Sequence, residues 1–159
     1  MYNIGDKIVY PMHGAGVIES IEEKEILGEK QNYYVVRIPV GDMKILIPIK
    51  NIEDVGIRQI IDQKDLDAAF LTLENTPSTT NPNWTKRYRE NMDKIKTGNI
   101  VDVADVVKTL MQRDKEKGLS TGERKMLSSA KQILISELIL VKNINQVEAE
   151  DVMNMYLKM

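Results

Sequence analysis

The hydrophobic periodicity of this chain changes once, near Gly56, and this change limits the folds that it can adopt. Before Gly56, short runs rich in β-branched and aromatic residues alternate with turns that contain glycine, a pattern typical of β-strands. We expect strands at residues 7–10, 16–22, 32–38 and 43–49. Such short strands predict a small, strongly curved sheet or a partial barrel.

Beyond Gly56, apolar residues recur at the spacing of a helical face. This spacing predicts helices at residues 57–73 (with a break near 63–64), 83–97, 100–111, 120–141 and 146–157. Asn83 is suited to cap the second helix, and Ser120 and Glu123 have the spacing of a capping box. The polar segment 76–82 is predicted to be a loop. The chain is therefore predicted to be an α+β protein of two domains, a β domain at 1–56 and an all-helical domain of about five helices at 57–159.

The composition argues against an enzyme. The chain has no cysteine and a single histidine, His13, so disulfides, thiolate catalysis and zinc knuckles are excluded. Its acidic residues are expected on solvent-facing helical positions, without a nucleophile or a base beside them. We expect no metal, no cofactor and no small-molecule substrate.

The chain shows no sign of a membrane segment. No apolar run approaches the roughly 18 residues that can span a bilayer, and the first residues do not form a basic region followed by an apolar stretch. We expect a cytoplasmic protein without a membrane partner.

The distribution of charge favours a nucleic-acid partner for the helical part. The net charge is only −2, but residues 84–131 hold 12 Lys and Arg against 7 Asp and Glu, whereas residues 1–59 hold 7 against 9. A local excess of positive charge is the usual footprint of contact with phosphates.

Trp84, the one tryptophan of the chain, has two interpretations. It lies four residues before Tyr88, so it could belong to the buried stripe of its helix. It is also followed by Lys86, Arg87 and Arg89, and an exposed aromatic ring beside cations can stack on bases or insert between them.

A second basic group follows and also has two interpretations. Acidic residues are interleaved with it, which is typical of a solvated charged face. At the ends of antiparallel helices the same cations could instead grip phosphates without sequence preference. The group consists of Arg113, Lys115, Lys117, Arg124 and Lys125.

Two motifs of the β domain also have a structural and a functional interpretation each. The run from His13 to Gly16 lacks the further glycine and the Lys-Ser/Thr pair of nucleotide loops, so a hairpin turn is predicted there. The strand that ends at Pro48 is either a core strand or an edge that pairs with a partner's sheet, and the proline favours an edge.

Residues 4–18, IGDKIVYPMHGAGVI, resemble the opening signature of the CarD family, which is shared with the polymerase-interacting domain of the bacterial transcription-repair coupling factor. Later segments look like further landmarks of that family in the same order. They are residues 33–36 (YYVV), 56–58 (GIR), 83–88 (NWTKRY), 103–110 (VADVVKTL) and 119–123 (LSTGE). The short chain and the Trp84 segment favour the stand-alone regulator over the coupling factor.

The resemblance implies a Tudor-like N-terminal domain that binds the RNA polymerase β subunit, largely by extending its sheet. It also implies a helical domain on promoter DNA at the upstream edge of the transcription bubble, where Trp84 would wedge into the minor groove and stabilise the open complex with little sequence specificity. The implied DNA contacts are Trp84, Lys86, Arg87, Arg89, Arg124 and Lys125.

The implied polymerase contacts are Lys24, Lys44, Leu46 and Ile47. The chain has Lys24 and Leu46 where family members commonly place arginines, and lysine does not reproduce the planar fork of arginine. The alternative function is a general DNA-binding protein of the nucleoid type, without a polymerase partner.

Overall fold

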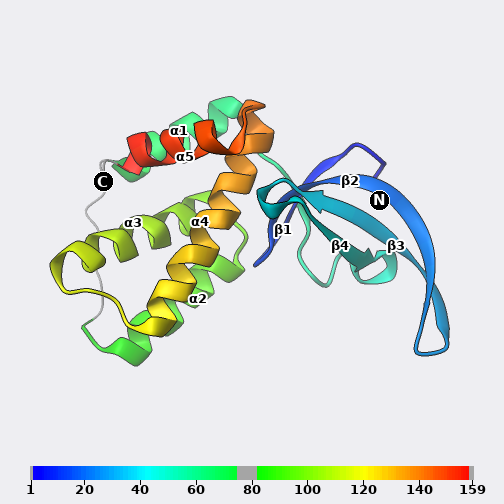
Figure 1. Ribbon diagram of the computed structural model, residues 1–159, viewed down its shortest axis with the longest axis horizontal. Helices are drawn as coiled ribbons and strands as arrows, with labels where there is room; N and C mark the ends of the chain where they lie inside the picture. The colour runs from blue at the N-terminus through cyan, green and yellow to red at the C-terminus, as the bar shows by residue number, and fades with distance from the viewer. Residues whose placement is uncertain (1, 75–81, 158–159) are drawn as a thin grey trace.

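The computed structural model describes residues 2–74 and 82–157. An antiparallel sheet precedes a group of α-helices, which confirms the predicted α+β order (Figure 1). The sheet has five strands in the order β4-β3-β2-β1-β5. The strands are β1 (Lys7–Tyr10), β2 (Gly14–Ile26), β3 (Glu29–Ile38), β4 (Met43–Pro48) and β5 (Arg58–Gln59).

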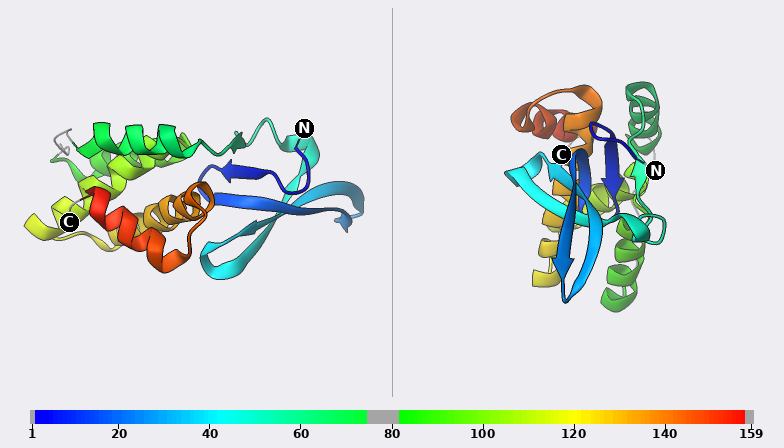
Figure 2. Two further views of the ribbon diagram at one scale, coloured as in Figure 1. Left: turned by 90° about the horizontal axis from the view of Figure 1, so that it is seen from above. Right: turned by 90° about the vertical axis from the view of Figure 1, so that its right-hand side faces the viewer.

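The β2–β3 hairpin is the longest element of the sheet and extends away from the helices (Figures 1 and 2). The predicted hairpin turn is present between β1 and β2, but it spans residues 11–13 and so ends earlier than predicted. Gly14, Ala15 and Gly16 already belong to β2 and pair with β1. Neighbouring strands run very close at this point. A Cβ on Gly16 would lie 2.6 Å from Cγ1 of Val36, so the glycine serves strand packing.

The first helix starts later than predicted. Ile57, Ile60 and Ile61 have helical spacing, but this segment is extended, and within it Arg58 and Gln59 pair with β1. The sheet thus continues past residue 56. The predicted loop at 76–82 lies, apart from Pro82, outside the described residues.

Within the described residues there are five α-helices, as predicted. They are α1 (Gln63–Glu74), α2 (Trp84–Lys96), α3 (Ile100–Glu116), α4 (Thr121–Lys142) and α5 (Gln146–Leu157). Asn83 caps α2, and Ser120 with Glu123 forms the predicted capping box of α4.

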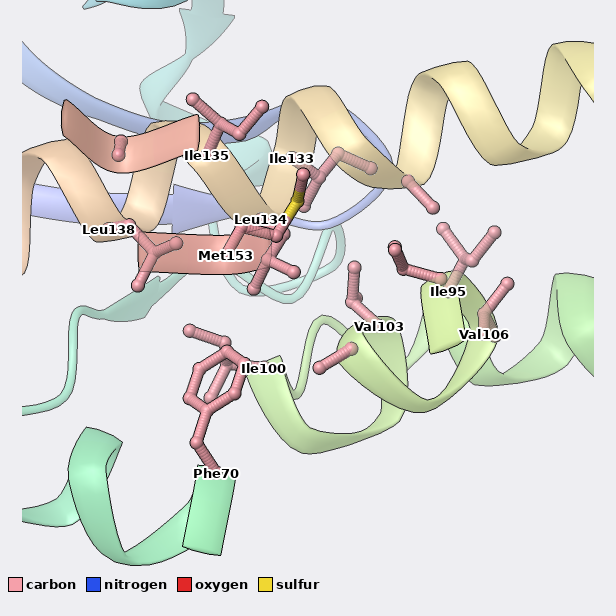
Figure 3. Close-up of a cluster of buried hydrophobic side chains, with 14 of the residues drawn as sticks. Phe70, Ile95, Ile100, Val103, Val106, Ile133, Leu134, Ile135, Leu138 and Met153 are labelled. Carbon is pink, nitrogen blue, oxygen red and sulfur yellow. The ribbon is translucent and has the colours of Figure 1, made fainter. Parts of the chain in front are cut away.

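The helices enclose the larger of two hydrophobic cores. Side chains of all five helices meet there, among them Phe70, Ile95, Val103, Leu134 and Met153 (Figure 3). A smaller core lies on one face of the sheet around Tyr34 and Ile47. Burial of these apolar faces holds each half together.

Helix α4 joins the two halves, because it packs on α3, on α5 and on β2. The Oγ atom of Ser136 accepts the backbone N–H of Ala15 at 2.8 Å. One residue further along α4, Glu137 receives two hydrogen bonds from Arg58, from Nη2 at 2.8 Å and from Nη1 at 3.1 Å. Lys7 adds a bond from Nζ to the carbonyl oxygen of Leu140 at 3.2 Å.

Across the described part of the chain, no helix combines the length and the apolar character needed to cross a membrane. The same residues contain no group of three or more His, Cys, Asp or Glu side chains arranged to hold a metal ion.

Candidate nucleic-acid interface and sheet edge

Trp84 is the first residue of α2 and lies at the surface. Its ring stacks on Tyr88 with a centroid distance of 5.2 Å and an interplanar angle of 23°. Its Nε1 donates a hydrogen bond to Oγ of Ser120 at 3.0 Å. The side chain is nevertheless exposed, with 45% of the residue's surface accessible. Both interpretations thus describe part of its environment: the ring packs on Tyr88, and much of it still faces solvent.

The N-termini of α2 and α4 lie side by side at this point. Ser120, the N-cap of α4, contacts the first residue of α2, and a Cβ on Gly122 would lie 3.5 Å from Tyr88. Two helix N-termini therefore present their partial positive charges beside the Trp84 ring. An anion close to the ring would be attracted by both.

The cations predicted to contact DNA differ in exposure: four are exposed and one is buried. Lys86, Arg89, Arg124 and Lys125 are exposed. Arg124 and Lys125 belong to adjacent flanks of α4, since Arg124 lies in a groove with Leu119 and Lys131, while Lys125 lies beside Tyr88 and Met92. All four exposed cations lie in the first two turns of α2 and α4, the helices whose N-termini meet at Trp84.

Arg87 is the exception. Its side chain is only 4% exposed and forms an ion pair with Glu123, which is 2% exposed. Nε donates to Oε2 at 2.8 Å and Nη2 donates to Oε1 at 3.2 Å. The Arg87 guanidinium, through these hydrogen bonds, lowers the pKa of Glu123 below its usual value despite the burial of the carboxyl. The structure therefore does not bring Arg87 to the surface that the other cations share.

The expectation that all acidic residues face solvent was wrong for Glu123 and Glu137, which are both buried and paired with arginine. For Glu123 the capping-box spacing was a usable signal, because its side chain turns back toward the N-cap. For Glu137 the signal was its place inside the apolar stretch between Leu134 and Leu138.

Strand β4 is an edge of the sheet, which agrees with the prediction from Pro48. Leu46 and Lys44 lie opposite Val35 and Arg37 of β3, so they share one face. Leu46 is 41% exposed. Ile47 points to the other face, where it is fully buried in the small core.

Lys24 lies opposite Gln31 of β3. Side chains alternate along a strand, so Gln31 shares one face with Val35 and Arg37, which lie opposite Leu46 and Lys44. Lys24 therefore lies on the same face as Leu46 and Lys44. Its Nζ is 3.6 Å from a carboxylate oxygen of Glu22. Three of the four predicted polymerase contacts therefore lie on the same face of the sheet, and Ile47 does not.

Lys44 belongs to a network of ion pairs with Glu19 and Arg37. Its Nζ lies 3.4 Å from Oε2 of Glu19, whose other oxygen pairs with Arg37 at 2.8 Å. The loss of some hydration raises the pKa of Glu19, but Lys44 and Arg37 outweigh this effect and hold it below its usual value.

Two family profiles together cover most of the chain. The profile described as "CarD-like/TRCF RID domain" matches residues 2–61, and the profile described as "CarD, C-terminal domain" matches residues 68–154. The chain belongs to the CarD family. This family consists of transcription factors and not of enzymes, so the expectation of a non-enzymatic protein is confirmed.

Two known proteins are similar to this CarD-family chain. The chain is 47% identical over 146 residues to a protein of Bacillus subtilis (strain 168) named "Putative transcription factor YdeB", and the match covers 92% of this chain and 95% of that protein. The solution structure of the 72-residue N-terminal domain of Myxococcus xanthus CarD is 25% identical, covers 37% of this chain and 79% of that one, and has a TM-score of 0.33. The shared family rests on the profiles and on the Bacillus relative.

Proposed function

We propose that this CarD-family transcription factor binds the β subunit of RNA polymerase through the edge of its sheet and contacts promoter DNA at the upstream edge of the bubble through Trp84. The observation that carries the proposal is the environment of Trp84. Its indole is exposed, contacts Tyr88 and Ser120, and lies where the N-termini of α2 and α4 meet. The first two turns of these helices carry four exposed cations. A rigid aromatic ring beside cations suits a wedge that enters distorted DNA.

The wedge would act by differential binding. A ring that fits only opened or kinked DNA shifts the equilibrium between closed and open promoter toward the open form, by as much as its preference for that form. Equal binding to both forms would shift nothing, however tight it was. The proposed result is a longer-lived open complex with little dependence on sequence.

The proposed phosphate contacts are Lys86, Arg89, Arg124 and Lys125. We omit Arg87, because its charge is neutralised in the buried pair with Glu123. Contacts to phosphates alone carry no sequence information, so these cations would position the protein and would not select a site.

The proposed polymerase contact is the β4 edge together with the face that carries Lys24, Lys44 and Leu46. An edge strand offers unpaired backbone groups to a strand of a partner. Ile47 would contribute its backbone only, since its side chain is buried. Polymerase binding is thus assigned to the sheet, which comprises residues 1–56 and the added strand β5, and DNA contact to the helices that follow, from α1 onward.

Reciprocal variants test this division. Trp84→Ala is expected to shorten the open-complex lifetime by roughly tenfold, the effect of losing one aromatic contact with a base, and to leave polymerase binding unchanged. Leu46→Glu is expected to weaken polymerase binding by about tenfold or more, as for a contact at the centre of an interface. Promoter dissociation assays and pull-downs with the isolated β lobe measure the two effects.

The reciprocal pattern also separates the proposal from the nucleoid-type alternative. An unchanged lifetime for Trp84→Ala would contradict the wedge. If gel shifts showed the same affinity for duplex DNA with and without polymerase, the protein would be a general DNA binder. The net charge of −2 predicts weak binding to duplex DNA alone. Polymerase would then have to supply the local concentration of the protein at the promoter.

A further inference from the structure

We infer that Ser120, Glu123 and Arg87 form a positioning network that fixes the orientation of the Trp84 indole before DNA binds. This inference rests on the proposed role of Trp84 in DNA contact. It assigns a function to a buried ion pair that the DNA contact itself does not use.

The Ser120 hydroxyl is the centre of the network. Its Oγ accepts the Nε1–H of Trp84 at 3.0 Å and the backbone N–H of Glu123 at 3.2 Å. The same Oγ donates its proton to Oε1 of Glu123 at 3.2 Å. A hydroxyl has one proton and two lone pairs, so every hydrogen-bonding position of Ser120 is occupied. The direction of the lone pair that holds the indole is therefore fixed.

Arg87 fixes the carboxylate that receives the Ser120 proton. Its fork holds both oxygens of Glu123, and its Nη1 donates to the carbonyl oxygen of Pro82 at 3.3 Å. An arginine fork bound to two carboxylate oxygens is geometrically specific, which keeps the Glu123 side chain in one position. The network thus runs from the segment before α2, through the start of α4, to the edge of the Trp84 ring.

The indole is consequently held at two places. Ser120 holds its edge and Tyr88 covers one of its faces. A side chain that is already ordered loses less conformational entropy when it binds, so the wedge is preorganised. Ser120, Glu123 and Arg87 are positioning residues, because they act on DNA only through Trp84.

The experiment uses the fact that Trp84 is the only tryptophan. In the full-length, ¹⁵N-labelled protein, the single indole N–H signal reports on the Ser120 bond directly. Ser120→Ala is expected to increase the exchange rate of this proton by about fivefold, the value of one neutral hydrogen bond. It should also shorten the open-complex lifetime to a value between those of the wild type and Trp84→Ala. Ser120→Thr, which keeps the hydroxyl, should restore both.

Two further variants separate positioning from helix capping. Ser120→Gly removes the hydroxyl but remains an acceptable N-cap, so it should release the indole as Ser120→Ala does. Asn99→Ala removes the side-chain cap of α3, which accepts the N–H of Val101, and it should leave the indole signal unchanged.

The inference is overturned if the indole proton exchanges as slowly in Ser120→Ala and Ser120→Gly as in the wild type. It is also overturned if both variants speed up this exchange but keep the wild-type open-complex lifetime, while Trp84→Ala shortens that lifetime. If Trp84→Ala has no effect on the lifetime, the proposed function fails instead, and the indole exchange still decides whether the network holds the ring.

Discussion

The buried pair of Arg87 and Glu123 gives a sharp stability prediction. Both side chains are almost completely removed from solvent, and two hydrogen bonds, of 2.8 and 3.2 Å, connect them. Glu123→Gln keeps the shape of the side chain but leaves the guanidinium charge buried without a counterion. Breaking one partner of a buried pair costs about 3–5 kcal/mol. Since domains of this kind are stable by about 5–15 kcal/mol, the variant should lose a large part of its stability.

The pair of Lys94 and Asp105 is the matched control. It connects α2 to α3, and its side chains are 43% and 26% exposed. Asp105→Asn makes the same change from carboxylate to carboxamide and should cost at most about 1 kcal/mol. For a protein of this size, 1 kcal/mol corresponds to roughly 2–4 °C in Tm. Glu123→Gln should therefore lower the Tm by about 6–20 °C, and Asp105→Asn by less than about 4 °C.

Thermal and urea unfolding followed by circular dichroism measure these differences. The double variant Arg87→Met with Glu123→Gln removes the isolated charge and should recover most of the lost stability. If Glu123→Gln and Asp105→Asn unfolded within about 1 kcal/mol of each other, the buried pair would behave like a surface pair and the reasoning would be refuted.

Two further predictions concern pH and the joint between the halves. Because the pKa of Glu123 is lowered in the folded state, its contribution to stability is complete above its unfolded value of about 4.3 and is lost as the pH falls through the folded value. Urea midpoints of the wild type should therefore fall below about pH 4.3, and those of Glu123→Gln should fall less. Gly14→Ala should cost more stability than Gly28→Ala in the same assay, because both glycines have a positive φ but only at Gly14 would the new Cβ lie 2.7 Å from Oγ of Ser136. Equal losses for the two alanine variants would mean that Ser136 moves aside.

Local patterns predicted the elements that local interactions form. The α4 start at Ser120 and the α2 cap at Asn83 follow from hydrogen bonds between residues three positions apart, which a sequence displays directly. The last helix, residues 146–157, was also predicted with its observed bounds.

The features that the local patterns did not predict depend on residues that are distant in sequence. Residues 57–61 have helical spacing, but backbone pairing of Arg58 and Gln59 with β1 holds them extended. Arg87 lies in a cluster of cations that is typical of phosphate contacts, but Glu123, 36 residues further on, neutralises its charge. Neither partner can be identified from residues near in sequence, because both pairings depend on how the chain closes on itself.

The two ends of α4 connect the proposed contacts to each other. At its start, Ser120 holds the Trp84 ring and Glu123 holds Arg87. Near its other end, Ser136 holds β2 and Glu137 holds Arg58. The 16 residues from Ser120 to Ser136 correspond to about 24 Å of helix. Figure 1 shows α4 reaching from the start of α2 to the sheet. A polymerase lobe bound at the sheet and DNA bound at Trp84 would therefore be held at a spacing that changes only if α4 bends or its joint with the sheet breaks. If the proposed contacts hold, this rigidity would place the wedge at one position on the promoter, although none of the proposed contacts reads the sequence.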